Sequence, residues 1–571
     1  MMEKMRLAME MLAKKRAAAV ADLREATRDP MKYQKDLLMK VIQDNKDTEY
    51  GRKYDFASIK TIEDFQARVP LSSYDDYAPY IERMARDGER NLITSYPIYF
   101  YNKTSGTVGV PKKISMTVPG VEVFQKYAAD YQTGLINELV GADKTQGRII
   151  SLVQACETQT LPDGVEFGAL SDYYMKQALP VWDRQFVIPA EAAFAKSGTN
   201  IRYIQGRYSL AAEDPVSMTA SFSSFAAEYF RYIEHNWELL VKDIEAGTID
   251  PSIEMPDEIR NQLLEKTSPM PERAAKLREI FSQGFDEPFA PKVWPRLVTF
   301  SSAMTGSFKS YGELVRDRYL GPDIQIFCRG VGASEGFFSV TTAMNSYDSV
   351  LVPDSVFYEF AEEKDGDVDL DHIITLDRLE EGKKYELIIT NLNGYYRYRM
   401  RDVFLVKGMY QQTPLVEFMY RSDRTVSIMG EKTTESALLE TAKNASKATG
   451  VELVNSTVYP DYDNTRYIFL MEIEKIPADL TEEEIRLAIE KALAHANPSM
   501  GDKVAKGICQ PTDVRFMQSE AFLLWRDLAV MRGASPGQQK PVTVIASEAQ
   551  KKFFFSQTED FEEVKHLFKK G

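Results

Sequence analysis

Tyr101-Asn102-Lys103-Thr104-Ser105-Gly106-Thr107-Val108-Gly109-Val110-Pro111-Lys112-Lys113 is the stretch from which the fold can be argued. It follows a strand-like run, residues 96–100, and its last ten positions hold three hydroxyl side chains, two glycines and two lysines. Glycine lets backbone N–H groups turn toward a ligand at little cost, and such N–H groups form an anion site together with hydroxyl and ammonium groups. The stretch therefore predicts a phosphate-binding loop, with a polar surface turn as the alternative.

Length and composition indicate a multidomain globular protein. The chain has 571 residues, which corresponds to two to four domains, and 44% of them are apolar. The net charge is 70 − 85 = −15, which argues against nucleic-acid binding and requires any phosphate contact to come from a local basic spot.

The few reactive side chains indicate a cytoplasmic protein without a zinc site. Three cysteines lie far apart in the sequence, which is typical of a reducing compartment, and the four histidines are not paired at ligand spacing. Charged residues interrupt the N-terminal helix pattern, so we expect no signal peptide. No run of about 18 apolar residues occurs, so we expect no membrane span.

Strand and helix patterns alternate along most of the chain, which indicates an α/β layer architecture. Strand-like runs cover residues 148–153, 297–300, 324–327 and 387–390, and helical patterns cover residues 31–95, 121–140 and 215–247, the last read as two helices. After residue 425 the pattern changes to strands at 451–458 and 467–473 and a helix at 481–496. We therefore predict a large N-terminal domain (1–420) of β-sheets flanked by helices, a boundary segment (421–425) and a small α+β domain (426–571).

A second motif, Gly330-Val331-Gly332-Ala333-Ser334-Glu335-Gly336, follows a predicted strand. It fits G-x-S-x-G, the nucleophile elbow of α/β-hydrolases, which would need Asp402 and a histidine, His495 or His566, as partners. In the other interpretation Ser334 contacts phosphate and Glu335 binds Mg²⁺, because Mg²⁺ takes one or two carboxylates together with phosphate oxygens and water.

A third motif, Tyr395-Tyr396-Arg397-Tyr398-Arg399-Met400-Arg401-Asp402-Val403, lies between two strand-like runs. An ionised carboxylate can accept hydrogen bonds from two ribose hydroxyls, which is the role that this pattern suggests for Asp402. The arginines would neutralise phosphate or brace the strand. The alternative is an edge strand with alternating exposure.

The three motifs together resemble the signature set of adenylate-forming enzymes. Residues 104–112 look like the phosphate loop of that superfamily, residues 333–335 like its second motif, and Tyr398-Arg399-x-x-Asp402 like its third. The chain is similar in more detail to the acyl-acid amido synthetases, best known as plant enzymes that conjugate auxin, jasmonate or benzoates to amino acids. This similarity extends along nearly the whole chain, at residues 80–83, 236–239, 294–295, 304–307, 357–360, 393–399, 533–535 and 539–541.

The resemblance implies a two-step reaction that uses ATP and Mg²⁺. A carboxylic acid is activated as an acyl-adenylate with release of pyrophosphate, and an amino acid amine then takes the acyl group and releases AMP. The resemblance also implies that the small domain is mobile, with residues 421–425 as its hinge. It implies catalytic roles for Lys540 and for Glu335, which would also bind the metal. It implies nucleotide contacts from Thr104, Ser105, Gly106, Thr107, Gly109, Lys112, Lys113, Gly332, Ala333, Ser334, Phe357, Tyr398, Asp402 and Arg421.

The sequence departs from the superfamily pattern at a few positions. Val331 replaces a common tyrosine, Arg401 replaces the glycine expected before Asp402, and the choice between Lys112 and Lys113 as the loop lysine stays open. Arg421 could contact the ribose and phosphate or form a surface salt bridge.

Four functions remain for comparison. The favoured one is the amido synthetase, acting on a carboxylic acid and an amino acid as a monomer or weak oligomer. The others are an acyl-CoA-type ligase with a thiol acceptor, a Ser334 hydrolase, and a non-catalytic homologue. An acyl pocket could draw on Tyr173, Tyr174, Phe337 and Phe338, although aromatic clusters of this kind are more often core.

Overall fold

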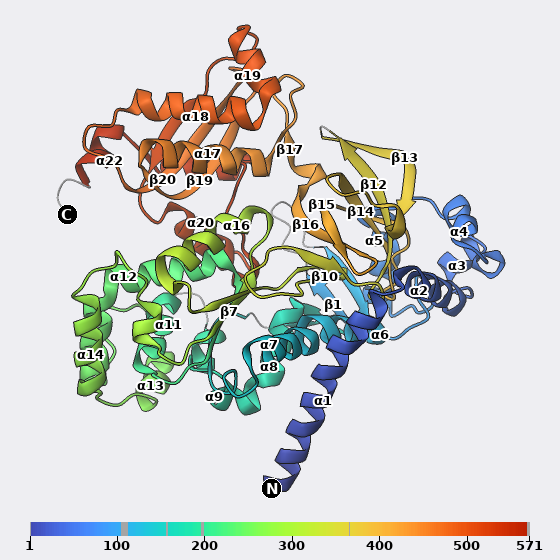
Figure 1. Cartoon of the computed structure of the whole chain (residues 1–571), viewed down its shortest axis with the longest axis horizontal. Helices are drawn as coiled ribbons and strands as arrows, with labels where there is room; N and C mark the ends of the chain where they lie inside the picture. Colours follow the sequence, from blue (N-terminus) through green and yellow to red (C-terminus); the bar gives the residue numbers. More distant parts are fainter. Residues whose placement is uncertain (1, 104–111, 156–157, 196–198, 365, 568–571) are drawn as a thin grey trace.

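The computed structural model describes residues 2–103, 112–155, 158–195, 199–364 and 366–567 (Figure 1). The chain from about residue 426 onward gathers in a lobe of its own, orange to red in Figure 1, which we call the C-terminal lobe. The preceding residues form a larger part, which we call the body. Helices and several β-sheets make up both parts, so the predicted α/β class is confirmed.

Helices form the outside of the body. They are α1 (Met2–Ala26), α2 (Pro30–Asp44), α3 (Glu49–Lys53), α4 (Ile62–Arg68), α5 (Tyr74–Asp87), α6 (Val118–Gln125), α7 (Gln132–Val140), α8 (Leu170–Ala178), α9 (Trp182–Gln185), α10 (Ala190–Ala193), α11 (Ile201–Ala211), α12 (Ser223–Ala246), α13 (Asp257–Glu265), α14 (Pro271–Phe281), α15 (Ala290–Val293) and α16 (Lys309–Leu314). A π-helical turn (Lys126–Tyr131) joins α6 to α7, so the helix expected over 121–140 is present with a widened turn inside it. Within the described residues, no helix combines the length and apolar character needed to cross a membrane.

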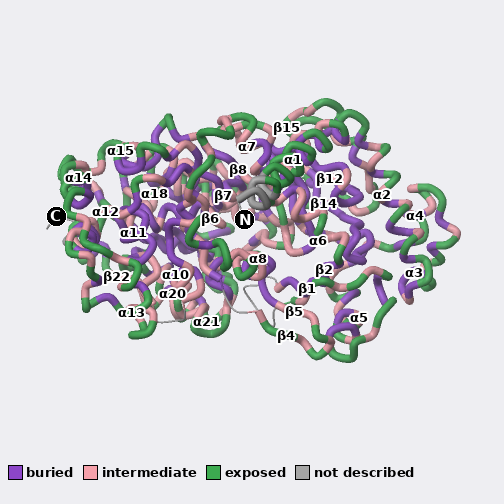
Figure 2. Tube along the Cα trace, turned by 90° about the horizontal axis from the view of Figure 1, so that it is seen from below, coloured by how far each residue is buried: buried purple, intermediate pink, exposed green. Residues whose placement is uncertain are grey.

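A four-stranded parallel sheet lies at the centre of the body. Its strands, in spatial order, are β3 (Ile149–Leu152), β6 (Ser217–Phe222), β7 (Thr299–Ala303) and β8 (Gln325–Cys328). One face of this sheet packs into the largest apolar core, against α11 and α12, where buried residues gather in Figure 2. The expectation of two helices over 215–247 was wrong at residues 217–222, where Met218 and Ala220 are buried between more exposed neighbours as in a strand; a single helix, α12, covers Ser223–Ala246.

An eight-stranded sheet lies beside the parallel one. In spatial order its strands are β13 (Asp367–Thr375), β12 (Phe357–Lys364), β14 (Lys384–Thr390), β15 (Tyr398–Tyr410), β16 (Thr413–Arg421), β11 (Ser349–Leu351), β10 (Gly336–Val340) and β9 (Val331–Ala333). The third motif opens β15, which pairs with a strand on each side. The edge-strand interpretation of that motif is therefore wrong.

Two shorter features attach to these sheets. A small sheet has the order β2 (Lys113–Thr117), β1 (Ile98–Lys103), β5 (Glu166–Gly168) and β4 (Gln159–Thr160), and β1 leads directly into the first motif. Helix α2 covers the region before β12: the Gln34 Nε2 donates hydrogen bonds to the carbonyls of Pro353 (2.6 Å) and Val356 (2.8 Å), and its Oε1 accepts one from the Tyr358 N–H (2.7 Å).

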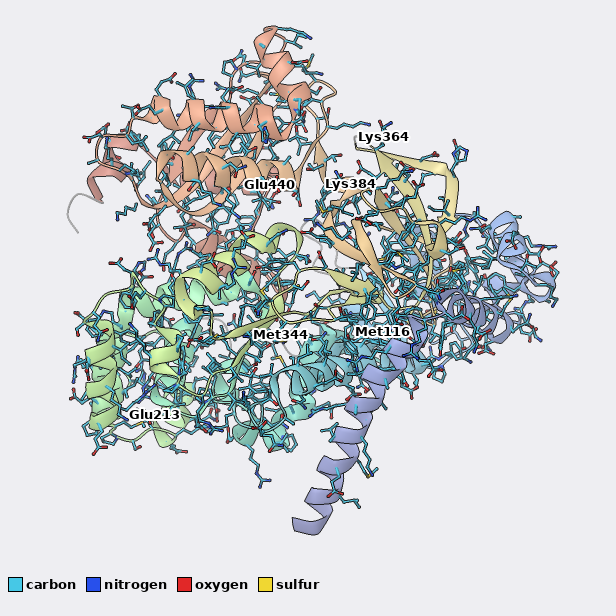
Figure 3. All side chains as sticks on the ribbon, viewed as in Figure 1. Met116, Glu213, Met344, Lys364, Lys384 and Glu440 are labelled. Carbon is cyan, nitrogen blue, oxygen red and sulfur yellow. The ribbon has the colours of Figure 1, made fainter. Side chains whose placement is uncertain are left out.

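The C-terminal lobe is an α+β unit, as expected. Its elements are β17 (Thr425–Val426), β18 (Thr433–Thr434), α17 (Glu435–Thr449), β19 (Glu452–Asp461), β20 (Arg466–Lys475), α18 (Glu482–Ala496), α19 (Pro498–Ala505), β21 (Asp513–Met517), α20 (Ala521–Met531), α21 (Glu548–Ser556), β22 (Thr558–Glu559) and α22 (Phe561–Leu567). Thr481 and Glu484 form the predicted capping box of α18. Two apolar clusters drawn from within the lobe form its own core. In Figure 3, Lys384 of the body and Glu440 of α17 mark the two sides of the junction.

Candidate active site

The second motif forms a tight hairpin. Gly332 and Ala333 lie in β9, and Ser334 and Glu335 form the turn into β10, which pairs antiparallel with β9. Gly330 has a φ of +80°, and a Cβ there would lie 2.1 Å from the Ser339 carbonyl oxygen, so only glycine fits. A nucleophile elbow requires a strand followed by a helix. Because a strand follows Ser334, the hydrolase interpretation is wrong.

Glu335 presents a buried carboxylate at the tip of this hairpin. The amides of Asn391 and Asn393 donate hydrogen bonds to the Glu335 carbonyl oxygen at 3.0 and 3.1 Å and fix the turn. The Tyr398 hydroxyl lies 3.4 Å from the Glu335 Oε1. Burial raises the pKa of the Glu335 carboxyl, and the charge of Asp402 raises it further. A carboxylate in this position gains from a cation beside it.

Asp402 and Arg421 face each other on neighbouring strands. They are partners in the β15–β16 register, and the Arg421 Nη1 lies 3.9 Å from the Asp402 Oδ1. The same guanidinium donates two hydrogen bonds to Asp423, at 3.1 and 3.2 Å. Burial raises the pKa of Asp402 to about 6, although the charges of Arg421 and Lys540 oppose the rise.

Arg401, which stands where the superfamily pattern has glycine, adopts a backbone conformation that glycine favours. Its φ is +64°, in the left-handed region that costs a non-glycine residue roughly 1–2 kcal/mol. The register of β14 and β15 shifts at this point, so the strand bulges just before Asp402. The bulge therefore survives the substitution as a strained turn.

Lys540 reaches the body from the C-terminal lobe. Its Nζ lies 5.5 Å from the ring centroids of both Phe222, at the end of β6, and Phe308, in a short helix at Gly306–Phe308. The two rings stack with their centroids 4.4 Å apart. The side chain keeps contact with solvent, but the surrounding protein desolvates it and lowers its pKa, and the charges of Arg424 and Arg421 lower it further. The positive charge thus faces two aromatic rings and is attracted by the Asp402 carboxylate.

A cavity of about 800 Å³ adjoins this lysine. Its lining combines the segment after β16 with the Lys540 segment, including Asp423, Arg424, Tyr459 and Lys551. Its volume is within the range of small-molecule sites. The structure therefore brings Glu335, Tyr398, Asp402, Arg421 and Lys540 together around one junction between the body and the C-terminal lobe.

Of the residues predicted to form the phosphate-binding loop at 104–113, the structure describes only Lys112 and Lys113. Thr104, Ser105, Gly106, Thr107 and Gly109 lie outside the described residues. The Lys113 Nζ forms an ion pair with Glu82 at 2.5 Å, and the Lys112 Nζ lies 4.9 Å from the Tyr74 ring centroid.

Three of the aromatic candidates are enclosed by the core, which for Phe337 and Phe338 is the favoured alternative. Phe357 is fully buried and packs edge-on against Phe65, so it has no surface to offer to an adenine. Phe338 is fully buried in the same core. Phe337 packs against Phe124 and is almost fully buried, which favours a core role for it too.

Tyr173 and Tyr174 of α8 retain the exposure that a pocket wall needs. Both are partly buried and pack against a small cluster that includes Phe100 and Leu170. The Tyr99 hydroxyl donates a hydrogen bond to the Tyr173 hydroxyl at 2.9 Å.

Asn102 stands at the start of the first motif, but the sequence did not reveal its supporting role. The Asn102 Nδ2 lies 3.4 Å from the Ser334 carbonyl oxygen, and its Oδ1 accepts a hydrogen bond from the Leu170 N–H at 3.1 Å. This residue therefore ties the start of the first motif to the tip of the second. Its place directly beside the loop was a usable signal, whereas its partners lie far along the chain.

The arginines of the third motif brace the sheet. The Arg397 guanidinium pairs with the buried Glu359 at 3.1 Å and donates to the carbonyls of Gln66 and Val69. Arg399 pairs with the buried Glu386 at 2.7 Å. Of the two roles considered for these arginines, the structure supports bracing.

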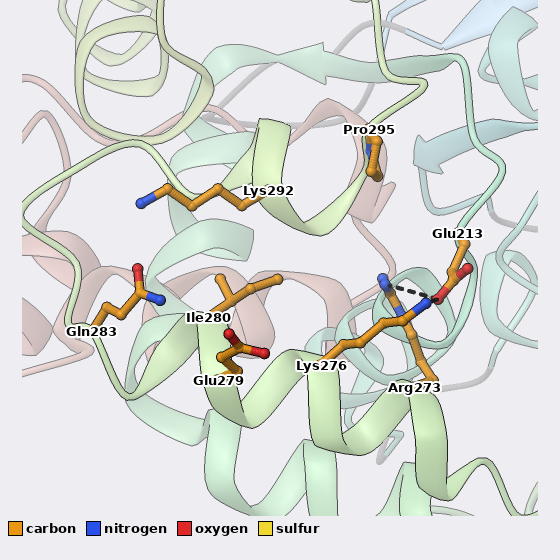
Figure 4. A pocket seen from close by; sticks show the side chains of 8 residues that line it. All are labelled: Glu213, Arg273, Lys276, Glu279, Ile280, Gln283, Lys292 and Pro295. Carbon is orange, nitrogen blue, oxygen red and sulfur yellow. Dashed lines mark hydrogen bonds and ion pairs between the residues drawn. The ribbon is translucent and has the colours of Figure 1, made fainter.

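A separate depression of about 350 Å³ lies away from the site, between α14 and the segment before β7 (Figure 4). Arg273 dominates it, but its guanidinium is buried and donates hydrogen bonds to the carbonyls of Leu210, Ala212 and Val293. Because these contacts tie neighbouring loops together, the depression reflects local structure.

Comparison with known proteins agrees with this geometry. Residues 19–325 match the GH3 family N-terminal domain, residues 349–421 the GH3 family central domain, and residues 434–549 the GH3 family C-terminal domain. The chain belongs to the GH3 family.

Relatives within the GH3 family match along nearly their whole length. The indole-3-acetic acid-amido synthetase GH3.3 of Arabidopsis thaliana is 25% identical over 91% of this chain and 90% of its own. The 4-substituted benzoates-glutamate ligase GH3.12 of the same plant is 25% identical over 92% of this chain and 94% of its own. The solved structure of the GH3.15 acyl acid amido synthetase has a TM-score of 0.82, 22% identity, and covers 95% of this chain and 97% of its own. The predicted family is thus confirmed.

Proposed function

We propose that this protein is an ATP- and Mg²⁺-dependent acyl-acid amido synthetase of the cytoplasm, acting as a monomer or weak oligomer. It activates a carboxylic acid as an acyl-adenylate and passes the acyl group to an amino acid amine. The observation that carries the proposal is the position of Lys540, which comes from the C-terminal lobe and lies over Phe222 and Phe308 beside Asp402. Membership of a family whose curated relatives are acid-amido synthetases and ligases supports the reaction class.

The nucleotide occupies the junction between body and lobe. Asp402 would accept hydrogen bonds from the ribose hydroxyls, Tyr398 would contact the nucleotide beside Glu335, and Arg421, 3.9 Å from Asp402, would neutralise phosphate charge. The loop at 104–113, including Thr104, Ser105, Gly106, Thr107 and Gly109, holds the β- and γ-phosphates. Lys112 is the better candidate for the loop lysine, because the Lys113 ammonium is already paired with Glu82.

Glu335 is the residue that fits Mg²⁺. Within the described chain, no three His, Cys, Asp or Glu side chains gather in a metal-binding cluster. A single buried carboxylate matches the way Mg²⁺ binds when phosphate oxygens supply its other ligands. When bound, the ion would neutralise charge on the phosphates.

The adenylation step joins two anions, so its barrier depends on positive charge at the reacting atoms. Lys540 provides a cation in a partly desolvated position, where electrostatic stabilisation is stronger than in water. No protein nucleophile is needed, because the substrate carboxylate attacks the α-phosphate. The acyl carbon then accepts the amine, and rotation at the hinge, residues 421–425, would move Lys540 away between the two half-reactions.

Pyrophosphate release tests the proposal. The protein is incubated with ATP, Mg²⁺ and a panel of carboxylic acids, and the products formed with pooled amino acids or CoA are identified by mass spectrometry. An amide product is expected. A thioester would support the acyl-CoA-type ligase instead, and no pyrophosphate with any acid would favour the non-catalytic homologue.

Lys540→Ala separates catalysis from nucleotide binding. We expect the pyrophosphate-forming rate to fall by roughly 100-fold or more, as for loss of one electrostatic donor, while ATP affinity measured by calorimetry changes far less. Lys551→Ala is the matched control, because Lys551 lines the same cavity and contacts the Tyr459 hydroxyl at 2.6 Å. Equal losses of rate and of ATP affinity in Lys540→Ala would show that its assigned role is wrong.

A further inference from the structure

One face of the central parallel sheet carries a row of hydroxyl side chains. Ser151, Thr219 and Ser301 are neighbours in register across β3, β6 and β7. The Ser301 hydroxyl lies 3.4 Å from the Thr219 hydroxyl, and the Thr299 hydroxyl donates to Ser217 at 2.9 Å one row below. Parallel sheets are normally apolar on both faces. This face is therefore built to receive something polar.

Arg329 lies at the end of this row, directly after β8. Its Nε and Nη2 lie 3.4 and 3.2 Å from the Ser301 hydroxyl, and its Nη2 also hydrogen-bonds to Thr219. No carboxylate of the described residues forms an ion pair with this guanidinium, and its Nη1 donates no hydrogen bond to any of them. Desolvation lowers the pKa of Arg329 to about 10, so it stays a cation at neutral pH.

Among the described residues only hydroxyl oxygens hold this partly buried guanidinium, and a cation withdrawn from water is costly unless an anion joins it. The backbone fixes Arg329 in place, because the neighbouring Gly330 packs against the Ser339 carbonyl and tolerates no side chain. The site also lies at the carboxyl ends of parallel strands, where ligands of α/β proteins bind. The place of Arg329 after β8, the constrained backbone beside it and the lack of a carboxylate partner among the described residues all indicate an anion site.

The distance to the reacting centre follows from strand β6. Thr219, which contacts Arg329, precedes Phe222, whose ring faces the Lys540 ammonium, by three residues. Because β6 bulges here, these three residues match only two of β7, Ser301 to Ala303, and span roughly 7 Å. A molecule with one anionic group at Lys540 and another at Arg329 therefore needs a spacer of several atoms.

We propose that Arg329, with Ser301 and Thr219, binds a second anionic group of the acyl acid, so that the preferred substrates are dianionic acids such as dicarboxylates. That the bound acid is adenylated rests on the proposed function, whereas the binding of its second anionic group at Arg329 does not. The residues touching this group are positioned for recognition, and the reaction occurs at the other end of the molecule.

The test compares straight-chain dicarboxylates (succinate, adipate, suberate) with the monocarboxylates of equal chain length. Calorimetry in the presence of Mg²⁺ and α,β-methylene-ATP measures binding, and ATP-dependent pyrophosphate release measures adenylation. The wild-type protein is expected to prefer a dicarboxylate in both. Arg329→Gln is expected to reduce that preference by about 10- to 150-fold, as for loss of a hydrogen bond to a charged group. Arg148→Gln is the matched control, because Arg148 pairs with Asp214 beside the same sheet and faces solvent.

An unchanged preference in Arg329→Gln, or a wild-type protein that prefers monocarboxylates, would overturn the inference. Weaker ATP binding with no change of acid preference would also overturn it, since the anion would then be a phosphate. If Arg329→Gln does not fold, Ser301→Ala should reduce the preference by about 3- to 10-fold. Dicarboxylate binding that depends on Arg329 without any pyrophosphate release would contradict the proposed function and leave this inference standing.

Discussion

At the scale of single residues, Asp402 has a charge state that changes near neutral pH. Its pKa is raised to about 6 by burial, which the nearby Arg421 and Lys540 only partly oppose. Below that pH the carboxyl is protonated in the free protein and loses most of its capacity to accept two hydrogen bonds. The same group that we assign to ribose recognition is therefore a titrating group.

ATP affinity should accordingly depend on pH. As the pH falls below about 6, the fraction of ionised Asp402 falls tenfold per unit, and we expect the dissociation constant for ATP to rise in step. Calorimetry between pH 5 and 8 measures this. Asp402→Asn should bind ATP weakly at every pH and lose this dependence, whereas Asp423→Asn, which removes the exposed partner of Arg421, should keep it. A pH dependence that persists in Asp402→Asn would assign it to another group.

At this scale the sequence singles out candidate site residues where they belong to short motifs. Glu335 and Asp402 stand in short motifs, Lys540 was singled out through the family resemblance, and the roles of all three stay predictions. The burial of Phe357 and the lack of a carboxylate beside Arg329 among the described residues could not be predicted for the same physical reason: both depend on neighbours from distant segments. An arginine in a sequence does not reveal whether a carboxylate faces it.

At the scale of elements, the β9–β10 hairpin depends on one close approach. Gly330 has a φ of +80°. The Cβ of an alanine at this position would lie 2.1 Å from the Ser339 carbonyl oxygen. Because the neighbouring atom is backbone, it cannot move without shifting β10. The turn that carries Glu335 would shift with it.

Gly330→Ala should therefore destabilise the protein by at least about 3 kcal/mol and abolish pyrophosphate release. Gly164→Ala is the matched control, since Gly164 has a similar φ of +83° and no atom within 4 Å of the added Cβ. Backbone strain alone should make that control cost about 1 kcal/mol. Chemical denaturation measures both values, and equal costs would show that the hairpin adapts.

Strand β6 was wrongly predicted from the sequence as part of a helix. Strand β6 runs directly into α12, and its six residues lack glycine or proline at the junction. Because no glycine or proline separates the strand from the helix, the helical pattern was predicted to begin at residue 215, before the true start of α12. The strand became evident only from its partners β3 and β7, whose sequences lie on either side.

At the scale of the whole molecule, charged pairs connect the C-terminal lobe to the body. Arg526 of α20 pairs with Glu228 of α12 at 2.5 Å, and its guanidinium lies 5.5 Å from the Phe225 ring centroid. Lys443 also pairs with Glu313 across the junction, at 2.5 Å. These contacts hold the lobe in the orientation that brings Lys540 to Phe222 and Phe308.

Arg526→Ala should therefore lower the pyrophosphate-forming rate by about tenfold, the value of one charged hydrogen bond, while the free energy of unfolding of the lobe changes little. Arg515→Ala is the matched control, because Arg515 pairs with Asp513 inside the lobe. High salt should lower the wild-type rate and have a smaller effect on the Arg526 variant. A rate that is the same in both variants would mean that this pair does not control docking.

The contact between α2 and the chain before β12 has a consequence for synthesis on the ribosome. Gln34 and Pro353, which share a hydrogen bond, are 319 residues apart in the sequence. At roughly 5–20 residues per second, translation needs about 16–64 s to cover that separation. During this interval the apolar side of α2, with Leu38, Val41 and Ile42, has emerged but lacks its covering sheet. Protease digestion of ribosome-bound chains that end before residue 349 should cut within α2, and chains that extend beyond residue 421 should be protected there.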